Sequence, residues 1–183
     1  KIFGIDMSDS MIKIAKNKKY DNNKLKFKTL DVLKLNHKNR YDTIISMFHV
    51  INYLTTKKKI IKAFQNINKS LKNNGLLLFD FWYAPAVRKK QLVKRSNSFE
   101  NKNFFLIRKV TPKLYKKNIA KINIKLSLKN KINHQIKNFS EDHKVRYFEM
   151  EELKKFLNIS GFNIVNSYEW LKKNRPNVSN WSA

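Results

Sequence analysis

The sequence lacks several residue types on which common kinds of site depend. None of its 183 residues is cysteine, which excludes a disulfide framework, a thiolate metal site and a cysteine nucleophile. No apolar run approaches the roughly 20 residues that span a bilayer, and no secretory signal follows the first residue. We therefore expect a cytoplasmic protein without a membrane partner.

Acidic residues and arginine are also scarce. The 13 Asp and Glu residues face 40 Lys and Arg residues, for a formal net charge of +27. Such an excess can mark a surface that neutralises nucleic-acid phosphates. However, 34 of the basic residues are Lys and only 6 are Arg, and the chain also holds 24 Asn and 18 Ile. Because Lys, Asn and Ile share A/T-rich codons, genomic bias explains the charge better, and nucleic acid is the less favoured partner.

Apolar residues make up 42% of the chain, enough to fill the core of one domain. In the first half their pattern predicts short strands alternating with helices. The predicted strands are residues 1–6, 25–30, 41–48 and 76–80, the last buried on both faces, and the predicted helices are residues 9–18 and 57–72. A polar turn is predicted at residues 19–24 and a helix-ending turn at residues 73–75.

The second half has a different pattern. Three Lys-rich segments alternate like antiparallel strands and suit a lid or a sheet extension: residues 104–110, 119–128 and 132–139. A final strand, helix and strand are predicted at residues 144–148, 149–160 and 162–170. The fold class is therefore α/β, a doubly wound and mostly parallel sheet with an antiparallel last strand and an inserted antiparallel lid. The predicted parts are a core (residues 1–87), an insertion (88–142), a unit completing the core (143–171) and a tail (172–183).

Ligands of open α/β sheets bind beyond the carboxyl ends of the strands. Asp6 ends the first predicted strand, where a carboxylate can accept hydrogen bonds from ribose hydroxyls, although an acid there also serves as a helix cap. Asp31 follows the second strand, where it can accept from an adenine amino group or simply stabilise a turn. Met7 and Met11 carry polarisable thioethers that suit an adenine ring and also suit a core.

These residues belong to a longer series. The sequence contains, in order, Gly4-Ile5-Asp6-Met7-Ser8-x-x-Met11, Asp31-Val32, Tyr41-Asp42-x-Ile-Ile-Ser46-Met47-Phe48 and Leu71-Lys-x-x-Gly75-Leu76-Leu-Leu-Phe79-Asp80. This series resembles class I S-adenosylmethionine-dependent methyltransferases, as do His143-x-x-Arg146-Tyr147-Phe148 and Gly161-Phe162-x-Ile164. The resemblance covers residues 1–81 and 143–170, and it implies the Rossmann-like fold of that family.

The resemblance also implies an S-adenosylmethionine cofactor. The implied contacts are Asp6 with the ribose hydroxyls, Met7 and Met11 with the adenine ring, Asp31 and Val32 with its edge, and Met47 and Phe48 with the methionine part.

One part of the family pattern is absent. The family holds the methionine part of the cofactor with a Gly-rich loop, on a strand between those at Ile2 and Thr43. This sequence has only three glycines and begins with Lys1 already inside the next strand. A strand with its crossover helix needs roughly 30 residues. We therefore expect an N-terminally truncated methyltransferase that lacks the first strand and binds the cofactor poorly or not at all.

Residues 46–53 and 79–87, around the ends of two predicted strands, resemble small-molecule N-methyltransferases, particularly those acting on nucleotide-linked amino sugars. Trp82 and Tyr83 would wall the acceptor pocket, or pack beneath the lid. His49 or Tyr53 can accept a proton from an amine nucleophile, although a single histidine is more often structural. The Asn/Asp-Pro-Pro-aromatic motif of base N-methyltransferases is absent. The histidines have no metal-ligand spacing, so we expect no metal.

The expected function is methyl transfer from S-adenosylmethionine to a small-molecule acceptor, with an amine as the preferred nucleophile. Two alternatives remain. One is an RNA-directed methyltransferase that uses the Lys-rich strands between Lys109 and Lys137, and the other is a non-catalytic fragment.

Overall fold

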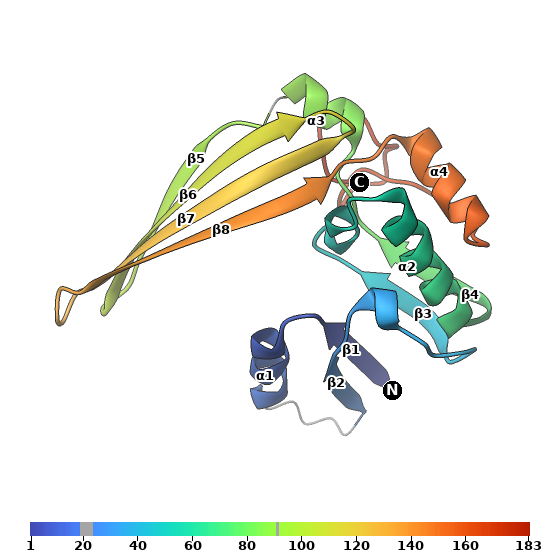
Figure 1. Ribbon diagram of the computed structural model, residues 1–183, viewed down its shortest axis with the longest axis horizontal. Coiled ribbons are helices and arrows are strands. Elements are labelled where there is room, and N and C mark those ends of the chain that lie inside the picture. The colour runs from blue at the N-terminus through green and yellow to red at the C-terminus, as the bar shows by residue number, and fades with distance from the viewer. Residues whose placement is uncertain (19–23, 91) are drawn as a thin grey trace.

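The computed structural model describes residues 1–18, 24–90 and 92–183, so residues 19–23 of the predicted polar turn lie outside the described residues. Figure 1 shows an α/β part from which a long antiparallel sheet projects as an arm. The elements are β1 (Ile2–Asp6), α1 (Asp9–Asn17), β2 (Leu25–Thr29), η1 (Val32–Lys34), β3 (Tyr41–Ser46), η2 (Val50–Tyr53), α2 (Lys57–Ser70), β4 (Leu71–Phe79), α3 (Ala84–Lys90), β5 (Arg95–Glu100), β6 (Phe104–Tyr115), β7 (Ile119–Asn130), β8 (Ile136–Arg146) and α4 (Met150–Ile159).

The α/β part contains two parallel strand pairs. β1 pairs with β2, and β3 pairs with β4. In the described residues these pairs form two separate sheets, so one edge of β1 and one edge of β3 have no ladder partner. The expected α/β fold is confirmed, and its sheet is interrupted where the resembling family has its first strand.

Local sequence explains where the helices begin. The Ser8 hydroxyl accepts the backbone N–H of Met11 at the start of α1, and the Thr56 hydroxyl accepts that of Lys59 at the start of α2. These caps satisfy amide groups that have no partner inside the helix. The helix predicted at residues 149–160 is α4, and Gly161 follows it with a φ of 83°, a conformation that favours glycine.

The main core lies around α2. Ile60, Phe64 and Ile67 recur at three- and four-residue spacing and are almost completely buried. They pack in one cluster with Leu153 of α4 and with Phe148. Burying each such side chain contributes roughly 1.5–3 kcal/mol, and the helix is therefore fixed mainly by its apolar face.

Two predictions about β4 are wrong. Leu77 and Phe79 pack against the core, but Leu76 is 58% exposed and Leu78 is 55% exposed, so the strand is not buried on both faces. The turn predicted at residues 73–75 does not end α2, which stops at Ser70; instead the ladder with β3 shifts register between Leu71 and Leu76, where Asn74 has a left-handed φ of 60°.

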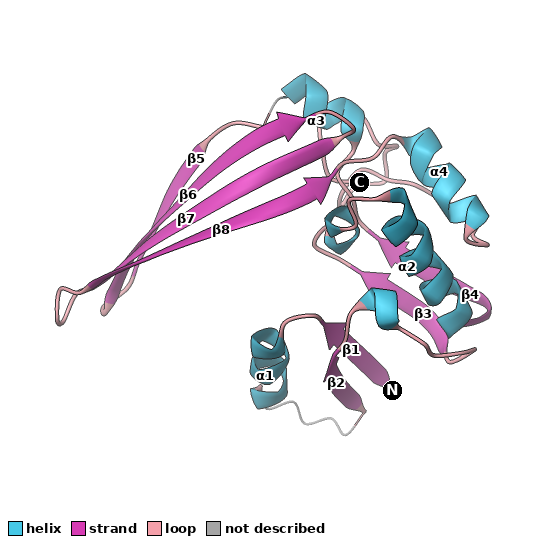
Figure 2. Ribbon diagram, in the orientation of Figure 1, coloured by secondary structure: helices cyan, strands magenta, loops and turns pink. Residues whose placement is uncertain are grey.

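The arm is a four-stranded antiparallel sheet in the order β5-β6-β7-β8 (Figure 2). The Lys-rich strands predicted at residues 104–110 and 119–128 are confirmed within β6 and β7, whereas the one predicted at residues 132–139 begins only at Ile136, in β8. The strand predicted at residues 144–148 is instead the end of β8, because Arg146 continues the ladder opposite Ile119. β5 was not predicted, since its sequence Arg-Ser-Asn-Ser-Phe-Glu has no alternating apolar pattern.

Residues on the two faces of the arm differ in chemistry. Alternation along the ladder puts Val110, Ile122 and Ile124 on one face, which we call the inner face. The opposite, outer face carries a row of directly opposed lysines in neighbouring strands: Lys109 with Lys125, and Lys121 with both Lys113 and Lys144. Opposed like charges destabilise a sheet by a few tenths of a kcal/mol or more per pair, roughly.

The C-terminal segment departs from the prediction. Residues 162–170 form no strand in the described structure, and a cavity of about 1080 Å³ lies between β4 and residues 161–173. The predicted tail instead folds back, and Ala183 exchanges two backbone hydrogen bonds with Phe81, of 2.8 and 3.0 Å. No helix in the described ranges is long and apolar enough to cross a bilayer.

Candidate functional site

The carboxyl end of β1 presents three residues predicted to bind cofactor. Asp6 is exposed, and one of its carboxylate oxygens accepts the backbone N–H of Ser8 at 2.7 Å. The side chains of Met7 and Met11 are 72% and 53% exposed. Neither methionine is therefore a core residue in this structure, and both are available to a flat apolar ligand.

The polar groups that follow β2 already have hydrogen-bond partners within the protein. The Asp31 carboxylate accepts the backbone N–H of Leu33 at 2.8 Å and so caps η1. The amide of Asn66 donates to the carbonyls of Val32 and Leu33, at 3.0 and 2.9 Å. Asp31 thus has the turn-stabilising role, and one of its oxygens remains free of these bonds.

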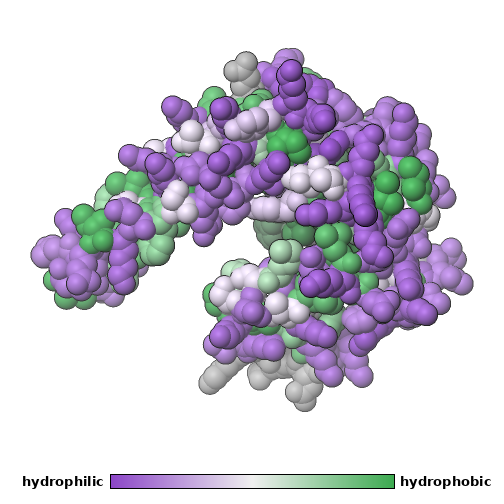
Figure 3. Space-filling model, in the orientation of Figure 1, coloured by the Kyte–Doolittle hydropathy of each residue, from purple (hydrophilic) through white to green (hydrophobic). Residues whose placement is uncertain are grey.

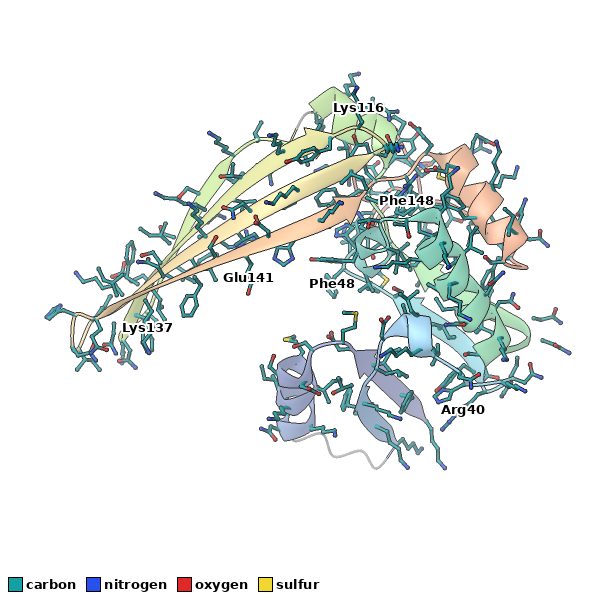
Figure 4. The ribbon with its side chains drawn as sticks, viewed as in Figure 1. Arg40, Phe48, Lys116, Lys137, Glu141 and Phe148 are labelled. Carbon is teal, nitrogen blue, oxygen red and sulfur yellow. The ribbon has the colours of Figure 1, made fainter. Side chains whose placement is uncertain are left out.

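The chain turns sharply after β3. Phe48 and His49 are consecutive non-glycine residues in the left-handed region, with φ of 63° and 62°. Each such residue costs of order 1 kcal/mol or more, and strain of this kind is concentrated at functional sites. Phe48 is 82% exposed, and Figure 4 shows it pointing from the end of β3 into the open space that faces α1.

A buried carboxylate holds this turn in place. Asp80, which is 2% exposed, accepts the backbone N–H of His49 at 2.9 Å. The His49 ring Nε2 lies 3.3 Å from the other Asp80 oxygen, an ion-pair distance without hydrogen-bond geometry, and 2.9 Å from the Ser182 hydroxyl. Asp80 and Ser182 therefore hold the Nε2 side of the imidazole, and Nδ1 is the nitrogen left for a ligand.

The pKa values of the two predicted bases are shifted in opposite directions. Burial lowers the pKa of His49 below its ordinary 6.5, although the Asp80 carboxylate opposes this effect. Burial and the charge of Glu141 raise the pKa of Tyr53 above 10.0. Near neutral pH His49 is thus a neutral imidazole and Tyr53 a phenol, whose oxygen lies 3.0 Å from Nδ1 of His143.

A second cavity, of about 270 Å³, lies between this turn and the inner face of the arm. We call it the acceptor cavity. Four of the predicted residues line it: Phe48, His49, Tyr53 and Trp82. In Figure 3 the surface beneath the arm is visibly hollowed.

Other predicted residues lie elsewhere. Tyr83 packs against the main core, neither at the acceptor cavity nor beneath the arm as predicted, while Met47 lines the larger cavity beside β4. Asp6, Met7, Met11, Asp31 and Val32 line neither cavity. The larger cavity follows the side of β4, whereas the acceptor cavity gathers titratable groups at a strand end, where α/β sheets bind ligands.

Several lining residues were not predicted. Asn52 is fully buried at the acceptor cavity, a conspicuous place for an amide within the apolar turn Val-Ile-Asn-Tyr. Trp181 belongs to the segment predicted as a tail, and its ring contacts that of Trp82 edge-on, with centroids 4.7 Å apart. Arg95 and Arg108 come from the arm, whose register the sequence pattern alone did not define.

These residues fit one half of the implied cofactor. The exposed Asp6 carboxylate suits two ribose hydroxyls, and Met7, Met11 and Phe48 offer apolar surface for an adenosyl group. For the methionine half, the three glycines provide no glycine-rich cradle, since Gly4 and Gly75 lie within strands and Gly161 follows α4.

Part of the sequence is similar to known methyltransferases. Residues 1–75 match the family model described as a methyltransferase domain. The candidate methyltransferase YqeM of Bacillus subtilis strain 168 is 30% identical over 80 residues, which are 43% of this chain. The matched stretch spans 32% of the length of YqeM.

Solved structures share the fold over most of the chain. An S-adenosylmethionine-dependent methyltransferase from Clostridium acetobutylicum superposes with a TM-score of 0.79 and 20% identity, over 98% of this chain and 71% of the other. The sugar N-methyltransferase KedS8 from Streptoalloteichus has a TM-score of 0.74 and 15% identity, over 87% and 62%. CalS10, an amino pentose methyltransferase from Micromonospora echinaspora, has a TM-score of 0.73 and 14% identity, over 92% and 69%. Residues 1–75 of the chain thus match a methyltransferase domain, and the chain as a whole has the fold of these S-adenosylmethionine-dependent methyltransferase structures.

Proposed function

We propose that this protein transfers a methyl group from S-adenosylmethionine to an amine nitrogen of a small molecule bound in the acceptor cavity. The observation that carries the proposal is the neutral, oriented imidazole of His49 at the strained turn after β3. The imidazole lines the cavity beyond the carboxyl end of β3, next to Met47 and Phe48, which are proposed to contact the methionine part of the cofactor.

S-adenosylmethionine, when bound, supplies an electrophilic methyl group on a sulfonium. An amine attacks such a carbon only through a free lone pair, so its proton must be removed. The Nδ1 of His49 accepts that proton. The Asp80 carboxylate, 3.3 Å from Nε2, then stabilises the imidazolium that forms.

The other lining residues position the acceptor and exclude water. The rings of Trp82 and Trp181 form an apolar wall, and the inner face of the arm covers the opposite side. Excluding water strengthens the contact between base and amine. The Tyr53 hydroxyl, held by His143, stays protonated and serves as a hydrogen-bonding group rather than as the base.

The proposed acceptor is an amino sugar, linked to a nucleotide. Support comes from the sequence resemblance after two strands, and from structural relatives named as sugar and amino pentose methyltransferases. A cavity of about 270 Å³ is near the lower end of ligand pockets, which suits one sugar ring.

The RNA-directed alternative has less support. Its main feature, the lysine rows at Lys109, Lys121 and Lys125, lies on the outer face of the arm. No lysine of the described residues lines the acceptor cavity. An RNA held by those lysines would therefore be on the far side of the sheet from His49.

The test uses this chain fused after a strand, Gly-rich loop and helix unit from a class I methyltransferase, with methyl transfer to amines followed by mass spectrometry. His49→Gln is expected to lower kcat at least about a hundredfold, the middle of the usual range for a general base, with KM little changed. The matched control is His134→Gln, on an exposed loop of the arm. An unchanged kcat in the His49 variant would overturn the proposal.

A further inference from the structure

The acceptor cavity has more hydrogen-bond donors than acceptors. Asn52 and Trp82 both line it, and the Nδ2 atom of the first and the Nε1 atom of the second are buried with no hydrogen-bond partner among the described residues. A buried donor of this kind is costly unless a ligand or water accepts from it. The cavity therefore favours a ligand that brings oxygen acceptors.

Two arginines add positive charge to the same cavity. Arg95 on β5 and Arg108 on β6 line it from the inner face of the arm. The register pairs Arg95 with Val110 and Asn97 with Arg108, so the two arginines are diagonal neighbours on adjacent strands. Diagonal neighbours are close enough for two long side chains to reach one group.

No described carboxylate forms an ion pair with either of these guanidinium groups. Arg88 and Arg146 form ion pairs with Glu149 and Glu152. The guanidinium of Arg95 instead lies over the ring of Trp181, 5.9 Å from its centroid. Stacking on an aromatic ring holds an arginine in place and leaves its N–H groups free.

Carboxylates are also missing from the described cavity wall. None of the lining residues is acidic. Two acids that adjoin lining residues are engaged with histidines: Asp80 with His49, and Glu141 with His143, each at 3.3 Å. The local field is therefore positive, and it favours an anion.

We propose that the end of the acceptor cavity farther from Tyr53 is a phosphate subsite, in which Arg95 and Arg108 bind the phosphate or diphosphate group of the acceptor. The planar, bidentate geometry of guanidinium matches phosphate oxygens, and two such groups suit a doubly charged ligand better than a carboxylate. The subsite rests on the proposed function, because it assumes that the acceptor occupies this cavity.

The register also gives the distance along the strands between the two arginines and His143, the partner of Tyr53. His143, which contacts Tyr53, is opposite Ile122, and Arg95 and Arg108 are two and four rungs farther out along the arm. At about 3.3 Å per residue this is roughly 7–13 Å along the strands. An acceptor that contacts both Tyr53 and the two arginines would span roughly this distance.

Calorimetry with inorganic pyrophosphate at low salt tests the subsite on the chain as it stands. The double variant Arg95→Gln/Arg108→Gln is expected to weaken binding by about tenfold or more, as the loss of charge-assisted hydrogen bonds implies. The double variant Arg95→Lys/Arg108→Lys keeps the charge but loses the bidentate guanidinium geometry. Its affinity for pyrophosphate is expected to lie between those of the Gln variant and the unaltered chain. The matched control is Lys109→Gln/Lys125→Gln on the outer face of the same strands, expected within twofold of the unaltered chain.

Three results would overturn the subsite. One is no binding of pyrophosphate at millimolar concentration, another is equal weakening in the outer-face control, and the third is acetate binding as tightly as pyrophosphate. Circular dichroism of each variant shows whether it is folded. Because this titration uses neither cofactor nor methyl transfer, its failure is distinguishable from failure of the proposed function, which the His49 variant measures.

Discussion

The buried carboxylate of Asp80, at the end of β4, accepts the backbone N–H of His49, at the end of β3, across 31 positions of sequence. This bond fixes a turn in which two successive residues are left-handed, and it sets the imidazole beside the acceptor cavity. One acid therefore links the fold of the α/β part to the proposed base.

Replacing Asp80 should destabilise the protein. Asp80→Ala leaves a buried N–H without an acceptor, which costs roughly 1–3 kcal/mol, whereas Asp80→Asn retains an amide oxygen that can accept. Urea unfolding of both variants measures the difference. Asp42→Ala, which removes an exposed ion pair with Lys72, is the control and should cost less than about 1 kcal/mol. Equal losses in all three variants would contradict the buried role of Asp80.

Stability should depend on the protonation of His49. Because burial lowers its pKa in the folded protein, the unfolded chain binds more protons as the pH falls through about 6.5. The free energy of unfolding should therefore fall as the pH is lowered below that value. His37 contributes in the same direction, since burial also lowers its pKa.

Urea unfolding between pH 5 and 8 measures this slope. The slope should be smaller in His49→Gln and smaller still in the double variant with His37→Gln. A slope that is identical in all three proteins would show that neither histidine is held neutral by the fold.

The interrupted sheet predicts uneven protection of backbone amides. β7 pairs on both sides, with β6 and β8, whereas in the described structure β1 and β3 each pair on one side only. Amides of β1 and β3 should exchange with deuterium faster than those of β7, because paired amides exchange only on opening. Exchange followed by mass spectrometry checks this, and protection of β1 equal to that of β7 would contradict the open edges.

The Phe64 ring fills the centre of the core around α2. Phe64 is fully buried, and its ring lies 5.5 Å from that of Phe79. Phe64→Ala should lower the free energy of unfolding by about 3–5 kcal/mol, which is the usual cost of such a truncation. Phe99→Ala on the arm, where the ring is 57% exposed, is the control and should cost far less. Similar losses in the two variants would place the core elsewhere.

Sequence patterns predicted the parts of this protein that are locally determined. Ile60, Phe64 and Ile67 revealed α2 by their spacing, and alternation revealed the long strands of the arm. The resemblance predicts a cofactor site at the carboxyl ends of β1, β2 and β3, and in the structure Asp6, Met7 and Phe48 are exposed at two of these ends.

The missed features depend on long-range contacts. Nothing in the sequence near Trp181 indicates that it meets Trp82, about a hundred positions earlier. β5 has no alternation, so only its pairing with β6 defines it, and the roles of Arg95 and Arg108 follow from that register. The exposure of Leu76 and Leu78 likewise depends on residues 162–170 standing away from β4. The cytoplasmic location and the division into parts remain predictions.

The most direct test of the central claim is the binding of S-adenosylhomocysteine, measured by calorimetry on this chain and on the version fused after a strand, Gly-rich loop and helix unit. We predict weak or no binding by the chain alone and clear binding by the fused protein. Asp6→Ala should weaken that binding about tenfold or more, and Asp9→Ala, in the adjacent first turn of α1, should not. No heat of binding in a fused protein shown to be folded, or equal binding by the Asp6 variant, would contradict the claim that these strand ends form a methyltransferase cofactor site.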